Sequence, residues 1–498
     1  MSCIPPIFSA KGHGMGTLSI ILFLLFFATT FALVGLFYAR RQRGGFEDYI
    51  VARNSQSATA TALTLTATTL GAWILFAPAQ AATWGGIAAV VGYALGAFVP
   101  RLLMIPLGSR MRALIPQGHT LSEYVLARYG RSMYALSLLI MLFYMFIAIT
   151  AEITAIAKLV TLLAPVPLWV TALVVLAATV VYTAYGGLRA SIFTDKVQMI
   201  VIVPLLVALC VFGWLATGGV HNIWLQVQHQ QPQLLDFKNI TGVKAGLTFL
   251  LALLLTGLFH QGNWQRVYAA HSNTAMRRGF LLAGLLVVPV ILVMGLFGLA
   301  FVGMQAGDDS SVALFSVLMP SLPTWFVILL LPLGLALVMS SADTAINAVS
   351  SLIAVDIRRL WPQAPVSVLL RWSRALIFPF VVLVWFFAAQ GYSVLYLFLL
   401  ADLLCCAAAF PVFIGLFSRH YHGAIASLST VIGLLAGLLY FPAPGQEATY
   451  LLESFLLAIF LPIAVSALWW CFWPKGRVYD FEQLQHLIRD RAEEGKNS

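Results

Sequence analysis

The sequence predicts an all-α polytopic membrane protein with about thirteen transmembrane helices. The chain has 498 residues, of which 61% are hydrophobic and 9% are charged, and its mean hydropathy is +0.93. This composition excludes ordinary globular, disordered and fibrous proteins. Apolar runs of about 20 residues, each enough to cross about 30 Å of hydrocarbon as a helix, recur from Thr17 to Trp473. The alternating pattern of a transmembrane β-barrel is absent, so the spans are predicted to be helices.

The first apolar run, residues 17–38, lacks a basic leader segment and a clear small-residue cleavage site. Arg40 and Arg41 follow it, so we interpret it as a retained helix that enters the membrane from outside. The later runs are assigned by length and apolar content, although Thr, Gly, Asn or Ser interrupts three of them. In chain order the predicted spans are 17–38, 58–83, 86–109, 132–162, 166–185, 193–217, 246–264, 279–304, 323–354, 370–389, 393–417, 423–441 and 450–473.

The Lys and Arg content of alternate loops predicts the orientation, because basic loops resist translocation. Loops assigned to the inside hold most of these residues, including Arg40, Arg110, Arg266 and Arg358. We therefore expect an odd number of spans in the plasma membrane, as in a bacterial inner membrane, with the amino end outside and the carboxyl end in the cytoplasm. The same bias accounts for the net charge of +10 without nucleic-acid binding. Outside stand only Lys11, Lys158, Lys238 and Lys244, while Arg101 falls within a span.

Several functional classes lack sequence support. No Walker loop, GxSxG or HExxH motif is present, so neither ATP-driven pumping nor hydrolysis is indicated, and we expect no enzyme activity and no cofactor. The residues after Trp473 are too few for a soluble catalytic domain. The five cysteines, which show no CxxC or paired spacing and so argue against a disulfide framework or a zinc site, are Cys3, Cys210, Cys405, Cys406 and Cys471.

Three spans carry polar residues that a mere anchor does not need. In residues 58–73, ATATALTLTATTLGAW, several Thr and Gly71 interrupt the apolar run, although Thr hydroxyls bonded to carbonyls one turn earlier are common in membrane helices. In residues 259–266, FHQGNWQR, Gly262 and Asn263 favour a helix break beside His260 and Gln261. The alternative is an ordinary helix end at the inner surface.

The third polar segment is LVMSSADTAINAVSSLIAVDI, residues 337–357. At 100° per residue, Ser340, Thr344 and Asn347 form one stripe of a helix, and Asp343 adjoins it. Small residues between them permit close helix packing, which explains part of the pattern. A carboxylate inside a span is costly without a partner, a cation or water, so Asp343 marks a functional-site hypothesis. Hydroxyls from this helix and carbonyls from an unwound helix would suit a sodium ion.

Three separated motifs resemble the sodium/solute symporter family, which contains sodium-coupled proline, sugar, sialic acid, pantothenate and urea carriers. The segment 337–357 resembles the eighth core helix of that family, and YTAYGGLRASIFTDKVQ, residues 182–198, resembles its YxxxGGLxAxxxTDxxQ motif. NWQRVYAAHS, residues 263–272, resembles its QRxxAAxS segment. The resemblance covers about residues 20 to 470 and, through GHTLSEYVLARYG and HQGNWQ, leans toward the urea carriers.

The resemblance implies a LeuT-like core of two inverted repeats of five helices, with the first and sixth core helices broken. The broken segments ATTLGAW and FHQGNWQ then occupy corresponding positions, where transporters bind substrate. The implied organisation is an extracytoplasmic segment 1–16, an extra helix 17–38, repeats 58–217 and 246–417, two further helices in 423–473 and a cytoplasmic tail 474–498.

The resemblance also implies ion sites. The shared sodium site would use the carbonyls of Ala67, Leu70 and Leu337 with the hydroxyls of Ser340 and Ser341. Asp343 departs from the hydroxyl expected in a second site, which leaves stronger cation binding, a proton or an internal pair open. Asp195 has another interpretation, as the N-cap of a helix that begins at residue 196. The positions that match this second cation site are Thr69, Asp195, Asp343 and Thr344.

By position, the solute pocket is expected at the two breaks and on the spans that carry the remaining deep carboxylates. The spans carry two such acids, Glu152 and Asp402, and no Lys at mid-depth, which favours a neutral or cationic, nitrogen-containing solute. Arg101 would reverse this preference if it lined the solute path or neutralised one of the acids. His260 has the alternative role of a hydrogen-bonded structural histidine. The candidate solute-binding residues are Gly71, Trp73, Glu152, His260, Gln261, Asn263 and Asp402.

The predicted function is sodium-coupled symport of a small polar solute by alternating access. A proton-coupled symporter and a solute-sensing transceptor that acts through a separate partner remain alternatives. A channel is disfavoured, because two matched broken helices suit an occluded site better than an open pore. Sodium ion and a small-molecule solute are the expected ligands, and no nucleic-acid partner is expected.

Overall fold

The computed structural model describes residues 16–41, 46–446, 449–472, 478–482 and 484. Residues 1–15, with Lys11 and Cys3, and most of the expected tail 474–498 lie outside the described residues. Within the described part the chain is all-helical and has no strand; the one isolated bridge joins Gln56 to Ala270. Among the described residues, ten helices are long and apolar enough to span a membrane, or eleven when one bent pair counts as a span.

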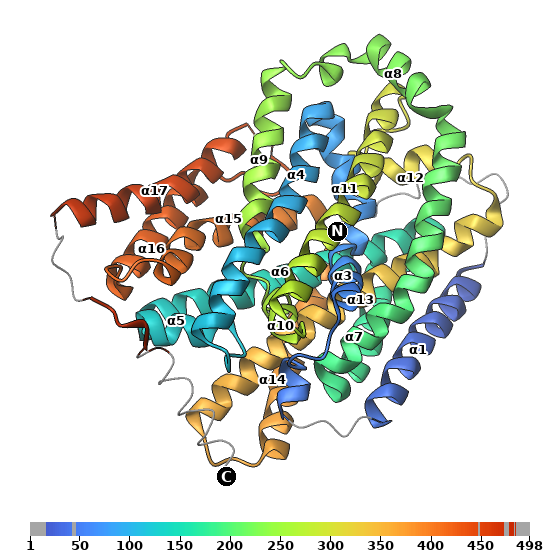
Figure 1. Cartoon of the computed structure of the whole chain (residues 1–498). Helices are drawn as coiled ribbons and strands as arrows, with labels where there is room; N and C mark the ends of the chain where they lie inside the picture. The colour runs from blue at the N-terminus through green and yellow to red at the C-terminus, as the bar shows by residue number, and fades with distance from the viewer. Residues whose placement is uncertain (1–15, 42–45, 447–448, 473–477, 483, 485–498) are drawn as a thin grey trace.

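Figure 1 shows these helices as a single bundle. The α-helices are α1 (Thr17–Arg41), α2 (Phe46–Ile50), α3 (Ala58–Thr69), α4 (Ala77–Leu114), α5 (Leu121–Tyr129), α6 (Arg131–Leu163), α7 (Leu168–Thr217), α8 (Gly219–Gln230), α9 (Ile240–Thr256), α10 (Gln261–Ala269), α11 (Asn273–Gly303), α12 (Ala313–Leu318), α13 (Thr324–Leu360), α14 (Val366–Ala388), α15 (Val394–Phe413), α16 (Gly423–Tyr440) and α17 (Leu451–Phe472). Short 3-10 turns are η1 (Ala72–Leu75), η2 (Pro232–Leu235), η3 (Ser310–Val312) and η4 (Ile414–Leu416).

The difference between thirteen predicted spans and ten or eleven long helices lies in α4 and α7, which contain 38 and 50 residues. At 1.5 Å per residue they would be roughly 57 and 75 Å long if straight, about twice the hydrocarbon thickness. Each is kinked at a glycine with positive φ, 61° at Gly86 and 56° at Gly187. Gly187 lies between the predicted spans 166–185 and 193–217, so α7 corresponds to two spans joined by a sharp turn. Gly86 begins the predicted span 86–109, and the span predicted at 58–83 consists of α3, η1 and the first residues of α4.

Both predicted helix breaks are confirmed. Helix α3 ends at Thr69, Leu70 and Gly71 leave the helical conformation, and η1 intervenes before α4 begins at Ala77. Helices α9 and α10 form the bent pair, with an angle of 55° across residues 257–260. The repeats predicted at 58–217 and 246–417 begin near these broken helices and end at the last residue of α7 and just after η4.

Helix α13 lies at the centre of the bundle, where every residue from Leu330 to Leu352 is buried. It packs against α7, α6, α14, α10 and α3, which brings the polar stripe of residues 337–351 against both halves of the chain. Helix α11 packs mainly on α4 and α3. Helix α1 and the pair α16 and α17 lie on opposite flanks of the bundle (Figure 1). The candidate site is therefore enclosed by the helices between these flanks.

Candidate functional site

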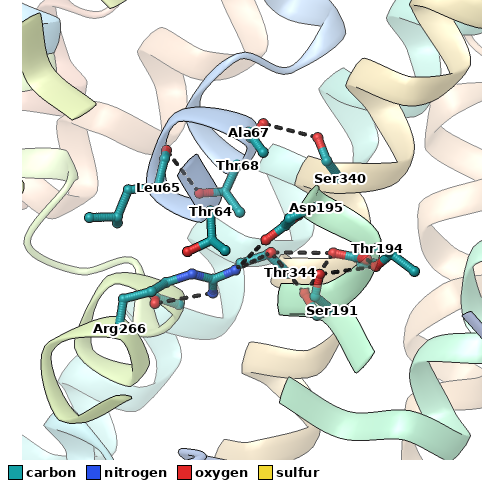
Figure 2. Close-up of polar contacts among 12 residues, drawn as sticks. Thr64, Leu65, Ala67, Thr68, Ser191, Thr194, Asp195, Arg266, Ser340 and Thr344 are labelled. Carbon is teal, nitrogen blue, oxygen red and sulfur yellow. Dashed lines mark hydrogen bonds and ion pairs between the residues drawn. The ribbon is translucent and has the colours of Figure 1, made fainter. Parts of the chain in front are cut away.

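A cluster of hydroxyl and carbonyl oxygens joins α3 to α13 beside the first helix break. The Ser340 hydroxyl donates to the carbonyl oxygen of Ala67 at 2.9 Å (Figure 2) and to that of Leu337 at 3.0 Å. The Ser341 hydroxyl donates to Leu337 at 3.2 Å and to Thr68 at 3.4 Å. Because hydroxyl hydrogens rotate freely, these five oxygens can instead turn their lone pairs toward one small cation.

The structure brings together four of the five residues predicted for the sodium site: Ala67, Leu337, Ser340 and Ser341. The second α3 carbonyl in contact with a serine belongs to Thr68. Leu70 lies just beyond the last turn of α3, with ψ at 69°, and the role of its carbonyl stays a prediction.

The end of α3 is stabilised by side chains that satisfy its backbone. The hydroxyls of Thr66 and Thr69 donate to carbonyls one turn earlier, at 2.8 and 2.6 Å, so back-bonding is confirmed. Beyond the break, the Ala72 N–H donates to the Glu152 carboxylate on α6 at 2.7 Å. A Cβ on Gly71 would clash with that carboxylate. Glu152 thus supplies the hydrogen-bond acceptor that the interrupted helix lacks.

A second buried cluster surrounds Arg266 of α10 (Figure 2). One Arg266 nitrogen lies 3.1 Å from the Asp195 carboxylate and donates to the Thr344 hydroxyl at 2.9 Å. The other terminal nitrogen donates to the Gly262 carbonyl at 3.3 Å. The side chains of Arg266 and Asp195 are 1% and 0% exposed. The assignment of Arg266 to an inner loop was therefore wrong, and its place in the QRxxAAxS segment was the signal that could have found it.

Asp343 lies in the same cluster and accepts four hydrogen bonds. One carboxylate oxygen accepts from Tyr182 at 2.8 Å and Thr194 at 3.0 Å, and the other from Ser191 at 2.9 Å and Thr344 at 3.3 Å. This set of donors offsets the cost of burying a carboxylate.

Of the four residues predicted for the second cation site, Asp195, Asp343 and Thr344 come together. Thr69 does not, because its hydroxyl donates to Leu65 and accepts from Arg101. The N-cap interpretation of Asp195 is wrong, since Asp195 lies well inside α7, eight residues after the kink at Gly187. The internal ion pair in this cluster joins Arg266 to Asp195, while the partners of Asp343 are hydroxyl groups, so the alternatives for Asp343 stay predictions.

A cavity adjoins the two helix breaks. It has a volume of about 130 Å³ and is partly open to solvent. Five predicted solute residues line it, namely Trp73, Glu152, His260, Asn263 and Asp402. The rest of its wall includes Thr68, Thr69, Tyr93, Arg101, Tyr144, Thr256, Ser341 and Phe398. Thr68 and Ser341 belong to the oxygen cluster as well, so the cavity and the predicted ion site share a wall.

Two predicted solute residues do not line the cavity. Gly71 lies at the break behind the Glu152 carboxylate. The Gln261 amide nitrogen donates to the His119 carbonyl at 2.9 Å, and its oxygen accepts from the Leu121 N–H at 3.1 Å, so this side chain is directed toward α5. His260 lines the cavity, and its Nδ1 accepts from the Gly262 N–H at 3.0 Å, so the structural hydrogen bond is present and the solute-binding role stays a prediction.

Gln261 connects the second break to a charged network on the face predicted to be cytoplasmic. The His119 imidazole lies 2.7 Å from Glu47 of α2 and 3.3 Å from Glu123 of α5. Burial alone lowers the pKa of His119, but Glu123 and Glu47 outweigh it and raise that pKa from 6.5 to about 9. Burial raises the pKa of Glu47, yet His119 and Arg53 bring it down to about 2. The network therefore holds a charged histidine between two carboxylates at neutral pH.

The thermal stability of the purified protein is expected to depend on pH through His119. A pKa raised in the folded state gives stability that is full below about pH 6.5 and is lost as pH rises through about 9, a change of about 3 kcal/mol. The contribution of Glu47 has the opposite sign, being full above pH 4.5 and lost as pH falls toward about 2. Thermal unfolding in detergent between pH 6 and roughly 9.5 measures the loss.

His119→Gln should flatten this decline, whereas the same change at the exposed His229 should leave it in place. An unchanged slope in His119→Gln would show that the network does not hold the proton.

Comparisons with known proteins agree with this arrangement. Residues 49–433 match the model of the sodium:solute symporter family. A spermidine transporter of Candida albicans is 23% identical over 428 residues, which cover 84% of this chain and 80% of the relative. The sodium/proline symporter of Salmonella typhimurium is 28% identical over 362 residues, 67% of this chain and 69% of the relative.

A solved structure of a Na+-coupled sialic acid symporter in a substrate-bound outward-open state shares the fold, with a TM-score of 0.74 at 17% identity. The match covers 94% of this chain and all of that one. The transporter Mhp1 of the nucleobase-cation-symport-1 family aligns with a TM-score of 0.55. The core architecture predicted from the sequence is therefore confirmed.

Proposed function

The chain belongs to the sodium:solute symporter family, and on that basis we propose that it couples the inward movement of sodium to uptake of a small polar, nitrogen-containing solute. The observation that carries this proposal is the contact of the Ser340 and Ser341 hydroxyls with α3 carbonyls at the helix break. Hydroxyl and carbonyl oxygens from two helices can replace the water around a sodium ion without adding charge. The solute cavity shares Thr68 and Ser341 with this site.

The proposed mechanism is alternating access. A sodium ion that enters from outside is driven by its gradient and by about 2.3 kcal/mol per charge for each 100 mV of membrane potential. Binding between α3 and α13 would order the break at Leu70 and Gly71. Thr69 and Glu152 adjoin that break and line the cavity, so solute would bind better to the ordered state. Coupling is this difference in affinity. We further propose that Arg266 supplies a fixed positive charge where relatives would place a second cation.

The proposed solute is neutral or cationic. The cavity wall holds two carboxylates, Glu152 and Asp402, and one guanidinium, Arg101. A net excess of acidic groups disfavours an anion with several negative charges. The named substrates of two relatives, spermidine and proline, both contain nitrogen, which supports the same class.

Purified protein in liposomes is expected to accumulate one or more nitrogenous solutes only when sodium is higher outside. The probes are urea, proline, choline, spermidine and a neutral sugar, each tested with an inward sodium gradient, with potassium in its place, and with a proton gradient alone. Accumulation driven by protons without sodium would replace sodium as the coupling ion. Passive equilibration with no gradient dependence would contradict symport.

A further inference from the structure

Two buried side chains of opposite charge line the cavity without forming an ion pair. Arg101 of α4 is 8% exposed and Asp402 of α15 is 3% exposed. Among the described residues neither takes part in an ion pair, although both face the same enclosed space. Leaving opposite charges unpaired in a buried site is costly unless a ligand completes them. The cavity is therefore suited to a ligand that interacts with both Arg101 and Asp402.

Arg101 lies between the two helix breaks. One terminal nitrogen donates to the Thr69 hydroxyl, directly before the break in α3. The other lies 3.4 Å from the position that a Cβ on Gly257 would take, at the break after α9. Its Nε has no hydrogen-bond partner in the described part of the chain. The guanidinium thus retains donors beside the cavity, in a planar arrangement that suits a carboxylate or carbonyl oxygen.

The two acids of the cavity differ in what they already bind. The Glu152 carboxylate accepts the N–H of Ala72 and so takes part in the break of α3. Asp402 accepts no backbone N–H among the described residues; its carboxylate lies beside the Thr256 hydroxyl at the end of α9 and near Tyr93 and Tyr144. A carboxylate has about four acceptor positions, so Asp402 keeps capacity to accept an N–H or a cationic group from a ligand.

We propose that the solute is amphoteric: it presents a carboxylate or carbonyl oxygen to Arg101 and an N–H or cationic nitrogen to Asp402. This inference rests on the symport proposed above and narrows its substrate class. Amino acids, betaines and small amides meet both requirements. Amines without a carboxylate or carbonyl oxygen leave Arg101 unsatisfied, and neutral ring sugars supply neither a carbonyl oxygen nor a nitrogen donor.

The expected discrimination is large. A buried site that is built to hydrogen-bond a solute group rejects an analogue without that group, because the protein donors are left unpaired. A hydrogen bond to a charged group contributes about 1.5–3 kcal/mol, and the lower value applies here because the cavity is partly open. We therefore expect a solute with the oxygen to bind at least about tenfold more tightly than the analogue without it.

Matched solute pairs test this on the full-length protein in detergent by calorimetric binding, in sodium chloride and in potassium chloride. The pairs are proline with pyrrolidine, glycine betaine with choline, and urea with guanidinium. In each pair the first solute has a carboxylate or carbonyl oxygen that the second lacks. In at least one pair the solute with the carboxylate or carbonyl oxygen should bind at least about tenfold more tightly than its partner. A fourth comparison, proline with tetrahydrofuran-2-carboxylate, removes the ring N–H and tests Asp402.

Arg101→Gln should bring the affinities within each matched pair to within about twofold of each other. Asp402→Asn should remove the preference for proline over tetrahydrofuran-2-carboxylate. Arg278→Gln, on the exposed surface of α11, is the matched control and should change neither ratio. Size-exclusion chromatography checks folding. If Arg101→Gln does not fold, Arg101→Lys is used, because it keeps the positive charge and removes the planar guanidinium. The affinity ratios of the matched solute pairs in the unmodified protein still decide the question.

Equal or tighter binding of pyrrolidine, choline and guanidinium would overturn the inference, as would binding of none of the probes or a preference that survives Arg101→Gln. Failure of the symport proposal has a different signature. In that case each solute would bind with the same affinity in sodium and in potassium, because solute binding would not depend on the ion.

Discussion

Replacing Ser340 and Ser341 together by alanine is expected to abolish sodium-driven accumulation of solute while leaving the protein folded. The change removes two of the five oxygens that meet between α3 and α13 and keeps the carbonyls of Ala67, Thr68 and Leu337. If each hydroxyl contributes about 1.5–3 kcal/mol to a bound cation, sodium affinity falls by about 100-fold or more. Two neutral hydrogen bonds lost from the interior cost the fold only about 1 kcal/mol each.

The measurement is initial solute uptake in liposomes as a function of external sodium. Ser351→Ala serves as a control, because within the described part of the chain that hydroxyl bonds only to the Ala348 carbonyl of its own helix, at 2.7 Å. Uptake by the control should keep its sodium dependence. Normal gradient-driven accumulation by the double variant would mean that sodium binds elsewhere.

Replacing Arg266 by methionine is expected to lower the free energy of unfolding by about 3–5 kcal/mol, the usual result of removing one partner from a buried ion pair. Asp195 would keep a fully buried carboxylate, one oxygen of which already has no hydrogen-bond partner among the described residues. The Thr344 hydroxyl and the Gly262 carbonyl would also lose their bonds to the guanidinium. Thermal unfolding in detergent, combined with the yield of folded protein, measures the loss.

Two further variants separate electrostatics from packing at Arg266. Adding Asp195→Asn to Arg266→Met removes the unpaired charge and should restore a large part of the stability. Lys244→Met breaks the half-exposed pair with Glu453 and should cost less than about 1 kcal/mol. If the double variant is no more stable than Arg266→Met, shape rather than charge explains the role of Arg266.

The helix breaks and the oxygen cluster were readable from the sequence, because their signals are local. Gly71 follows a run of threonines, and Gly262 and Asn263 interrupt an apolar segment. Adjacent serines on the buried face of α13 complete the pattern. Such features depend on backbone conformation and helical periodicity, which a few neighbouring residues determine.

The partners of the charged residues were not readable in the same way. Arg266 follows Trp264 in the manner of a helix end at the membrane surface, and only the approach of α7 and α13 buries it against Asp195 and Thr344. Likewise, the direction of the Gln261 side chain depends on the position of His119, which is more than a hundred residues away in the chain. Contacts of this kind are set by tertiary packing, on which the separate spans carry no information.

The bond from Ala72 to Glu152 has a mechanical consequence. The backbone N–H of Ala72 has its acceptor on another helix, so this hydrogen bond joins η1 to α6 at Glu152. Any rotation that parts them exposes a bare N–H and a bare carboxylate to whatever fills the gap. We therefore expect η1 and the part of α6 around Glu152 to keep their relative position when the break rearranges.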